Sequence, residues 1–387
     1  MLKRLLGSVT LCLCCLMVQA QPVASTMPYR LVAGKLVMEM SVNGTTYPFV
    51  LDTGGQTSFL KSFADRLGWT AVDTLTAVDA NNETISFARV AVSHIATPDG
   101  KITFSDVPAL LLEQDAGLSC FGAVGIIGSD MLGEMILSID GESRTLTLAP
   151  GSAAPAISLR RLIEFDAAAG GMPIIPFQVV PGITLKALFD TGSPQLLSLR
   201  AQDYQRIDGR AGVQCLARSY GESNMGISGR RQEEEAMRVG IPALSVGSVK
   251  FEAVVTTTAE APISLLGTEL LTYGRITIDY PRQRLYYEAY RPEETHRPES
   301  RYADIELTVK EGDLVVARVW GEDHEGIAPG DKVLAINGKP VGTFDFCESI
   351  TQGIPALKKK KKSRLTIDCR AGEKTVVYER KPIRFNR

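Results

Sequence analysis

The chain reads Phe49-Val50-Leu51-Asp52-Thr53-Gly54 near its start and Ala187-Leu188-Phe189-Asp190-Thr191-Gly192 in its middle. In both places a run of apolar residues with β-strand character ends on Asp-Thr-Gly. The turn signal Asn43-Gly44 starts nine residues before Asp52, and Pro181-Gly182 starts nine residues before Asp190. Each copy is therefore predicted to be a β-hairpin whose second strand delivers an aspartate to a turn.

The similarity between the two copies continues downstream. Ile126-Ile127-Gly128 ends 76 residues after Asp52, and Leu265-Leu266-Gly267 ends 77 residues after Asp190. Each glycine is followed by apolar residues and then by a predicted strand that ends on aspartate, at Asp140 and Asp279. A repeat of this length predicts two similar units of short strands, related by an approximate two-fold axis.

Two carboxylates at matched positions indicate a particular chemistry. Amide hydrolysis without a metal or a covalent nucleophile needs a base for water and an acid for the carbonyl oxygen. Two carboxyl groups held about 3 Å apart share one proton, so they supply both roles. We therefore predict that Asp52 and Asp190 are a catalytic pair. The three histidines lack metal-ligand spacing and no nucleophile-elbow motif occurs, so we expect neither a metal site nor any cofactor.

The residues beside each aspartate suit this role. Gly54 and Gly192 allow backbone amides to approach the carboxylates closely. Thr53 and Thr191 can hydrogen-bond across the two-fold axis and lock the two loops together.

These motifs resemble the two half-sites of the pepsin/retropepsin superfamily of aspartic proteases, over residues 30–290. The resemblance implies a mainly β fold with two pseudo-two-fold-related, β-barrel-like lobes of retropepsin-like size, at 28–149 and 157–290. It also implies a polypeptide substrate in a cleft between the lobes. The residues it implies as support for the pair are Thr53, Gly54, Gly128, Thr191, Gly192, Ser193 and Gly267.

The resemblance further implies one or two hairpin flaps over the cleft. By position, one flap candidate is 79–84, with Asn81 and Asn82, and the other is 220–229, with Tyr220, Gly221 and Gly226. Ordinary surface turns are the alternative for both segments.

The two half-sites differ at the residue after Asp-Thr-Gly, which is Gly55 in the first copy and Ser193 in the second. A hydroxyl donor beside Asp190 favours its ionised form. This asymmetry predicts that Asp190 is the base and Asp52 carries the shared proton.

The last part of the chain differs in character. After a polar linker at 290–301, the stretch 326–341 resembles the PDZ domains of bacterial envelope proteases, which implies a small α+β domain at 300–387. PDZ domains add an extended peptide to a sheet edge and hold its terminal carboxylate in a nest of backbone amides. The residues at the corresponding position are Gly312, Asp313, Leu314 and Val315. Because Glu311 and Asp313 repel a carboxylate, two alternatives stay open: binding of an internal extended segment, and packing without peptide binding.

Composition places the chain among ordinary globular proteins, with 44% hydrophobic residues, 22% charged residues and a net charge of −2. That balance argues against a nucleic-acid partner. Residues 1–20 have the pattern of a signal peptide, with Lys3 and Arg4 before an apolar stretch and a small-residue site at 18–20. No later stretch reaches the ~20 apolar residues of a membrane span. We therefore expect an exported protein, periplasmic, in the cell envelope or secreted.

Four cysteines follow the predicted signal peptide: Cys120, Cys215, Cys347 and Cys369. Disulfides and buried free thiols both fit an exported chain, and spacing alone does not decide between them.

The sequence as a whole predicts an exported aspartic endopeptidase whose C-terminal PDZ domain assists the binding of a substrate or partner. The alternative is a peptide-binding protein on the same scaffold without catalytic activity.

Overall fold

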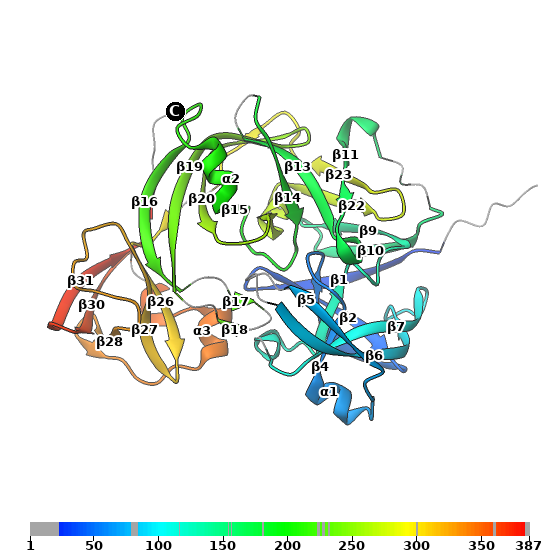
Figure 1. The fold of residues 1–387 in the computed structure, drawn as a ribbon, viewed down its shortest axis with the longest axis horizontal. Coiled ribbons are helices and arrows are strands. Elements are labelled where there is room, and N and C mark those ends of the chain that lie inside the picture. The colour runs from blue at the N-terminus through cyan, green and yellow to red at the C-terminus, as the bar shows by residue number, and fades with distance from the viewer. Residues whose placement is uncertain are drawn as a thin grey trace, which may run out of the picture.

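The computed structural model describes residues 23–78, 84–115, 117–153, 155, 157–179, 182–222, 225–226, 229–230, 233–298, 301–358 and 361–383. The predicted signal peptide at 1–20 lies outside this range. Within the described part of the chain, none of the helices has the length and apolar character needed to cross a membrane. The fold is mainly β (Figure 1).

The first half of the chain forms a unit of strands with one short α-helix and one 3₁₀ helix. Its elements are β1 Ser25–Val32, β2 Lys35–Val42, β3 Thr45–Asp52, β4 Ser58–Leu60, α1 Lys61–Arg66, β5 Asp73–Val78, β6 Thr84–Ala96, β7 Thr103–Leu112, η1 Leu118–Phe121, β8 Gly125–Gly128, β9 Met135–Asp140 and β10 Thr145–Pro150.

The second half has a corresponding set of strands. Its elements are η2 Leu159–Arg161, β11 Leu162–Glu164, β12 Asp166–Ala167, η3 Ala169–Gly171, β13 Pro173–Val179, β14 Thr184–Phe189, β15 Leu197–Arg200, α2 Ala201–Ile207, β16 Gln214–Gly221, β17 Met225–Gly226, β18 Gly229–Arg230, β19 Glu234–Val246, β20 Val249–Ala259, β21 Ser264–Leu266, η4 Thr268–Thr272, β22 Gly274–Asp279 and β23 Arg284–Ala289.

Each half closes a ring of paired strands, and the two rings have matching order. In the first half the ring runs β2-β3-β8-β4-β7-β6 and closes through the β2–β6 pairing. In the second it runs β13-β14-β21-β15-β20-β19 and closes through β13–β19. Closure removes the exposed strand edges that an open sheet would present.

The two halves meet in a sheet to which both contribute. Strand β9 pairs antiparallel with β22, in the register Ile139↔Ile276, Ser138↔Thr277 and Leu137↔Ile278. In the sequence repeat, Leu137 corresponds to Ile276 and Ile139 to Ile278, so exchanging the two copies turns one of these pairs into the other. The approximate two-fold axis therefore passes by Ser138 and Thr277. At that point the Thr277 hydroxyl donates to Ser138 Oγ at 2.9 Å.

Turn chemistry explains the first hairpin. Asn43 and Gly44 have φ of 50° and 83°, as a two-residue type I′ turn requires, and they join β2 to β3 as the predicted hairpin, with Val42 paired to Thr45. In the second hairpin β13 and β14 pair as expected, from Gln178↔Thr184 to Ile174↔Leu188. Pro181 of that turn lies outside the described residues.

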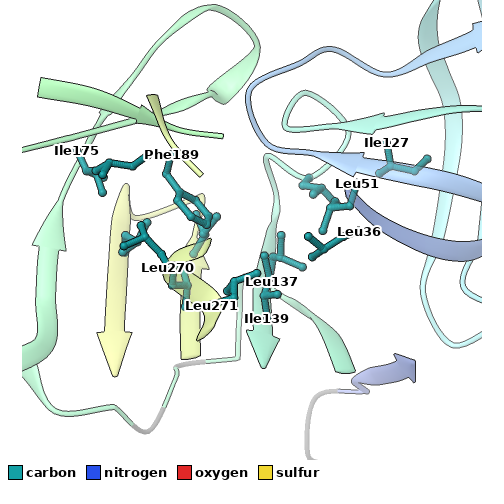
Figure 2. Packing of buried hydrophobic residues seen from close by; sticks show 14 of the residues in the cluster. Leu36, Leu51, Ile127, Leu137, Ile139, Ile175, Phe189, Leu270 and Leu271 are labelled. Carbon is teal, nitrogen blue, oxygen red and sulfur yellow. The ribbon is translucent and has the colours of Figure 1, made fainter. Parts of the chain in front are cut away.

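One buried cluster extends through both halves. Leu36, Leu51 and Ile127 belong to it in the first half, and Leu271 of the second half packs in it together with Leu137 (Figure 2). Burying apolar area of this kind stabilises a domain by about 25 cal/mol per Å². The strands that lead to Asp52 and Asp190 are therefore anchored in a shared core.

The C-terminal module, residues 301–383, has a separate core around Ile305, Leu314, Val316, Val333 and Leu365. Its elements are β25 Arg301–Tyr302, β26 Ile305–Lys310, β27 Asp313–Trp320, β28 Lys332–Ile336, β29 Lys339–Pro340, α3 Phe346–Gln352, α4 Pro355–Lys358, β30 Lys362–Cys369, β31 Gly372–Glu379 and β32 Lys381–Pro382.

The predicted linker before the module contacts the second half. Strand β24, Thr295–His296, pairs parallel with β20 of the second half, and His296 is buried there. The chain thus stays attached to the second half up to the start of the module.

Candidate active site

Asp52 and Asp190 each sit at the exit of a central strand. Asp52 ends β3, which pairs in parallel with β8 so that Asp52 lies opposite Gly128. Asp190 follows β14, which pairs in parallel with β21, and its amide donates to Leu266 O at 2.9 Å. Both aspartates are only partly buried, whereas the threonine after each is fully buried. The strands therefore leave both carboxyl groups partly accessible, while the threonines that follow them are buried in the interior.

The glycines of the two motifs lie against the opposite aspartates. A Cβ on Gly54 would lie 2.6 Å from Asp190 Oδ1, and a Cβ on Gly192 would lie 2.5 Å from Asp52 Oδ2. Each glycine amide also donates to the aspartate of its own loop, at 3.0 Å from Gly54 to Asp52 and 2.7 Å from Gly192 to Asp190. The loops interlock so closely that a side chain at either glycine would displace a carboxyl group.

The two threonines join the loops reciprocally. The Thr53 amide donates to Thr191 Oγ1 at 3.0 Å, and the Thr191 amide donates to Thr53 Oγ1 at 3.1 Å. Each hydroxyl in turn donates to a strand carbonyl of the other half, Thr53 to Phe189 O at 2.7 Å and Thr191 to Leu51 O at 2.8 Å. This network fixes the separation of the two aspartates, because every bond crosses between the halves.

Replacing Thr53 with valine removes a fully buried hydroxyl that both donates and accepts. It leaves the Thr191 amide and the Phe189 carbonyl without partners, so we expect a loss of about 2–4 kcal/mol in the free energy of unfolding. Denaturant unfolding at constant pH measures this loss. Thr46→Val, at an exposed position of β3, is the matched control and should change stability by less than about 0.5 kcal/mol. Equal stability of the two variants would contradict the structural role of the threonine network.

The interlocked loops bring the carboxyl groups of Asp52 and Asp190 together, and each acts on the titration of the pair. Burial, together with the Asp52 carboxylate, raises the pKa of Asp190 well above its ordinary value. Such a pair titrates as a unit and retains one proton at a pH where isolated carboxyls are ionised. The arrangement therefore has one proton-bearing carboxyl and one carboxylate side by side.

The contact on which the predicted division of roles rests is absent among the described residues. Ser193 is buried and its amide donates to the Asp190 carbonyl at 3.1 Å, but among the described residues its hydroxyl makes no hydrogen bond to the Asp190 carboxyl. Burial and the neighbouring Asp52 raise the pKa of Asp190, which favours its protonated form within the pair.

Lys35 was missed by the sequence reasoning. It follows a tight turn at Ala33 and Gly34, with φ of 49° and 81°, which packs against Pro194 of the second half. The Lys35 ammonium donates to the Gly192 carbonyl, and its charge lowers the pKa of Asp190, opposing burial and Asp52. Nothing in the local sequence marks Lys35 for this contact with Gly192. The lysine reaches it because the turn before β2 packs against Pro194 of the second half.

Replacing Lys35 with methionine removes that positive charge, so the pKa of Asp190 should rise further. The singly protonated pair then persists to higher pH, and the alkaline limb of a pH–rate profile should move upward. Lys250→Met, at an exposed position on β20, is the control and should leave the profile in place. A profile of Lys35→Met that coincides with the wild type would show that this ammonium does not act on the pair.

Gly128 at the end of β8 and Gly267 just after β21 allow the chain to pass close behind the Asp52 loop and the Asp190 loop, respectively. A Cβ on Gly128 would lie 2.5 Å from Gly55 O, and a Cβ on Gly267 would lie 2.3 Å from Ser193 O. Only a residue without a side chain fits such contacts.

An acidic residue lies two positions after each of these glycines and also supports the loops. Asp130 accepts from the Thr57 amide at 2.8 Å, and Glu269 accepts from the Leu196 amide at 3.1 Å. Burial raises the pKa of both carboxyl groups. The sequence signal for these two carboxyl groups is the repeated pattern Gly128-Ser129-Asp130 and Gly267-Thr268-Glu269.

The flap candidates are only partly described. Strands β5 and β6 form a hairpin that reaches Val78↔Thr84, while its tip with Asn81 and Asn82 lies outside the described residues. The second candidate is a long hairpin of β16 and β19, extended by the Met225↔Arg230 pairing of β17 and β18, which includes Gly226. Tyr220 is exposed on it, whereas Gly221 is held between β19 and the C-terminal module.

The predicted peptide-binding residues of the module do not form a carboxylate nest. Glu311 and Gly312, with φ of 50° and 86°, make a two-residue hairpin turn between Lys310 and Asp313. Leu314 and Val315 are buried in β27, and Val315 pairs with β26 on one edge and with β28 on the other. Asp313 forms an ion pair with Lys332 at 2.7 Å. A peptide cannot add to a strand position that is already paired on both edges, so this prediction is wrong.

One disulfide joins distant parts of the chain. Cys120 in η1 of the first half is bonded to Cys347 in α3 of the module, across 227 residues of sequence. Cys215 is exposed as a free thiol, and Cys369 is buried as one.

Comparison with known families gives an aspartic-protease match for the part of the chain that contains Asp52. Residues 38–131 match a family described as Aspartyl protease. The match covers the first half from β2 to just beyond β8, and so includes Asp52, Thr53, Gly54 and Gly128 but ends well before Asp190. No curated protein matches the chain.

Proposed function

We propose that this protein is an exported aspartic endopeptidase with two lobes, the first and second halves of the chain, and a PDZ domain as its C-terminal module. The observation that carries the proposal is the pairing of Asp52 and Asp190, one from each half, by the interlocked Asp-Thr-Gly loops, with the raised pKa of Asp190. The family match supports a general aspartic-protease character and a polypeptide substrate.

In the proposed mechanism Asp52 accepts a proton from a water molecule as its oxygen attacks the scissile carbonyl carbon. Asp190 donates its proton to the carbonyl oxygen, which gives a tetrahedral gem-diol. When the C–N bond breaks, the amine nitrogen takes the proton that Asp52 gained, and a gem-diol hydroxyl returns a proton to Asp190. The amine and the carboxylic acid leave, and the pair regains its single proton.

Export is proposed from the signal-peptide pattern of residues 1–20. The disulfide between Cys120 and Cys347 supports it, because disulfides persist in oxidising compartments outside the cytosol. The same compartments, the periplasm, the cell envelope and the extracellular space, would hold the polypeptides to be cut.

Cleavage of a denatured protein from about pH 3 to 7 tests the proposal, because this range spans the titration of the pair. We expect internal peptide bonds to be cut, with inhibition by a statine peptide that mimics the gem-diol. Cleavage that resists the statine inhibitor but stops with a metal chelator would overturn it. Tight statine binding without any turnover would favour the alternative, an inactive peptide-binding protein.

A further inference from the structure

The C-terminal module is built into the second half through a shared sheet. Strand β27 pairs antiparallel with β16, in the register Ser219↔Trp320, Tyr220↔Val319 and Gly221↔Arg318. The sheet therefore runs without a break from β14, which precedes Asp190, to β31 at the far side of the module. Figure 1 shows the module below the second half, with β17 and β18 between it and the first half.

Two buried arginines reinforce this junction. Arg318 of β27 donates to Gly221 O at 2.9 Å, to Glu222 O at 2.8 Å and to Ser219 Oγ at 2.8 Å. Arg238 of β19 lies 4.1 Å from the ring centroid of Trp320 and donates to Ala303 O at 3.2 Å. Because buried guanidinium groups need all of these partners, separating the module from the second half would be costly.

The module is also attached to the first half. The Cys120–Cys347 disulfide bonds the second residue of α3 to η1. With β27 held by one half and α3 by the other, the position of α3 relative to the two aspartates is restrained from both sides.

A cavity of about 360 Å³ lies where the module meets the second half. From the second half, its walls include Thr257 of β20 and Gln195, an exposed residue in the loop that follows Asp190-Thr191-Gly192. From the module, they include Leu307 of β26 with Phe346 and Ile350 of α3. The loop of one catalytic candidate and the apolar face of α3 thus line the same cavity.

We propose that this cavity is a substrate subsite, in which the module binds a large apolar side chain of the extended polypeptide that is being cut. Leu307, Phe346 and Ile350 give the cavity an apolar wall, and Thr257 and Thr308 offer hydroxyl groups that can bond the main chain of an extended segment. The remaining wall is polar and charged, with Glu222, Glu234, Glu306 and Arg318. The volume exceeds what one side chain fills, so it can hold a side chain together with adjoining backbone. This role rests on the proposed function, and it makes α3 a determinant of specificity.

The first test compares cleavage specificity in the full-length protein. Ile350→Glu places a charge on the half-buried face of α3 that lines the cavity, and Val377→Glu, at an exposed position of β31, is the matched control. With a peptide mixture as substrate, kcat/KM for peptides that carry leucine or phenylalanine at one fixed distance from the scissile bond should fall about 10-fold or more in Ile350→Glu. Peptides too short to reach the cavity should be cut as by the wild type.

The second test does not depend on catalysis. The chain has two tryptophans, and Trp320 lines the cavity, so its emission reports occupancy once Trp69 is replaced with phenylalanine. In an Asp52→Asn background, extended peptides of about 12 residues, each with one leucine at a different position, serve as probes. We expect the position of the leucine to decide which peptides change the emission, and Ile350→Glu to abolish the change.

The outcomes separate the two proposals. Cleavage with an unchanged preference in Ile350→Glu, or no peptide-dependent change in Trp320 emission, would overturn the subsite. Leucine-dependent binding that Ile350→Glu abolishes, in a protein that cuts nothing, would leave the subsite standing and refute the proposed function.

Discussion

Asp52→Asn and Asp190→Asn are each expected to lower kcat/KM by about 10³-fold or more. Asparagine keeps the shape of aspartate but can neither accept a proton from water nor donate one to the carbonyl oxygen at the right step. Either change also removes the shared proton on which both roles depend. Initial rates on one peptide substrate, measured across the acidic range, test this expectation. Asp106→Asn is the control, because Asp106 is exposed and its φ of 52° suits asparagine.

The stability of Asp190→Asn distinguishes lost chemistry from lost structure. A carboxyl whose pKa is raised in the folded state contributes stability that is fully present below its unfolded-state pKa. That contribution is lost as the pH rises through the folded-state value. At neutral pH, above the ordinary pKa of an aspartate, the burial that raises the pKa of Asp190 therefore destabilises the wild type, and the neutral amide carries no such cost. We expect Asp190→Asn to unfold at the same or a higher temperature than the wild type at about pH 7. A lower melting temperature there would mean that its inactivity reflects misfolding.

Gly192→Ala should reduce kcat/KM by about 100-fold or more, because displacement of a reacting group by about 1 Å has consequences of this size. The new Cβ would lie 2.5 Å from Asp52 Oδ2 and 2.7 Å from its Cγ, which is closer than van der Waals contact allows. The Asp52 carboxyl group must therefore move from its position in the pair. Rates measured at saturating substrate should fall as well, since the defect lies in the reacting groups.

Gly342→Ala is the matched control for this change. A Cβ on Gly342 meets no atom within 4 Å, so activity and stability should stay close to those of the wild type. If Gly192→Ala is as active as Gly342→Ala, the two aspartate loops do not approach each other as described.

Local signals in the sequence were sufficient for much of the fold. The Asn43-Gly44 turn set the first hairpin because few residues other than asparagine and glycine adopt positive φ readily. In the module, β28 and α3 likewise follow local apolar patterning, with Val333 and Ile336 on the strand and Phe346 and Ile350 on the helix. The repeat of Asp-Thr-Gly and the later glycine indicated the site, because each copy obeys the same packing constraint at Gly128 and Gly267.

The remaining features depend on contacts between segments that are distant in sequence. Cys120 and Cys347 are 227 residues apart, and neither has a neighbour that points to the other. Lys35 reaches the pair only because the turn before it packs on Pro194. The turn at Glu311 and Gly312 was misread as a nest, because glycine beside acidic residues is common to both structures and only the strand pairing separates them.

A carbon-13 NMR titration of the aspartate carboxyl groups tests the central claim most directly, namely that Asp52 and Asp190 share one proton. In the wild type we expect one of these two carboxyls to stay protonated well above the ordinary aspartate range, in a titration coupled to the other. In Asp52→Asn the pKa of Asp190 should fall, because the neighbouring negative charge is gone. Two independent titrations in the ordinary range, unchanged by that substitution, would contradict the account.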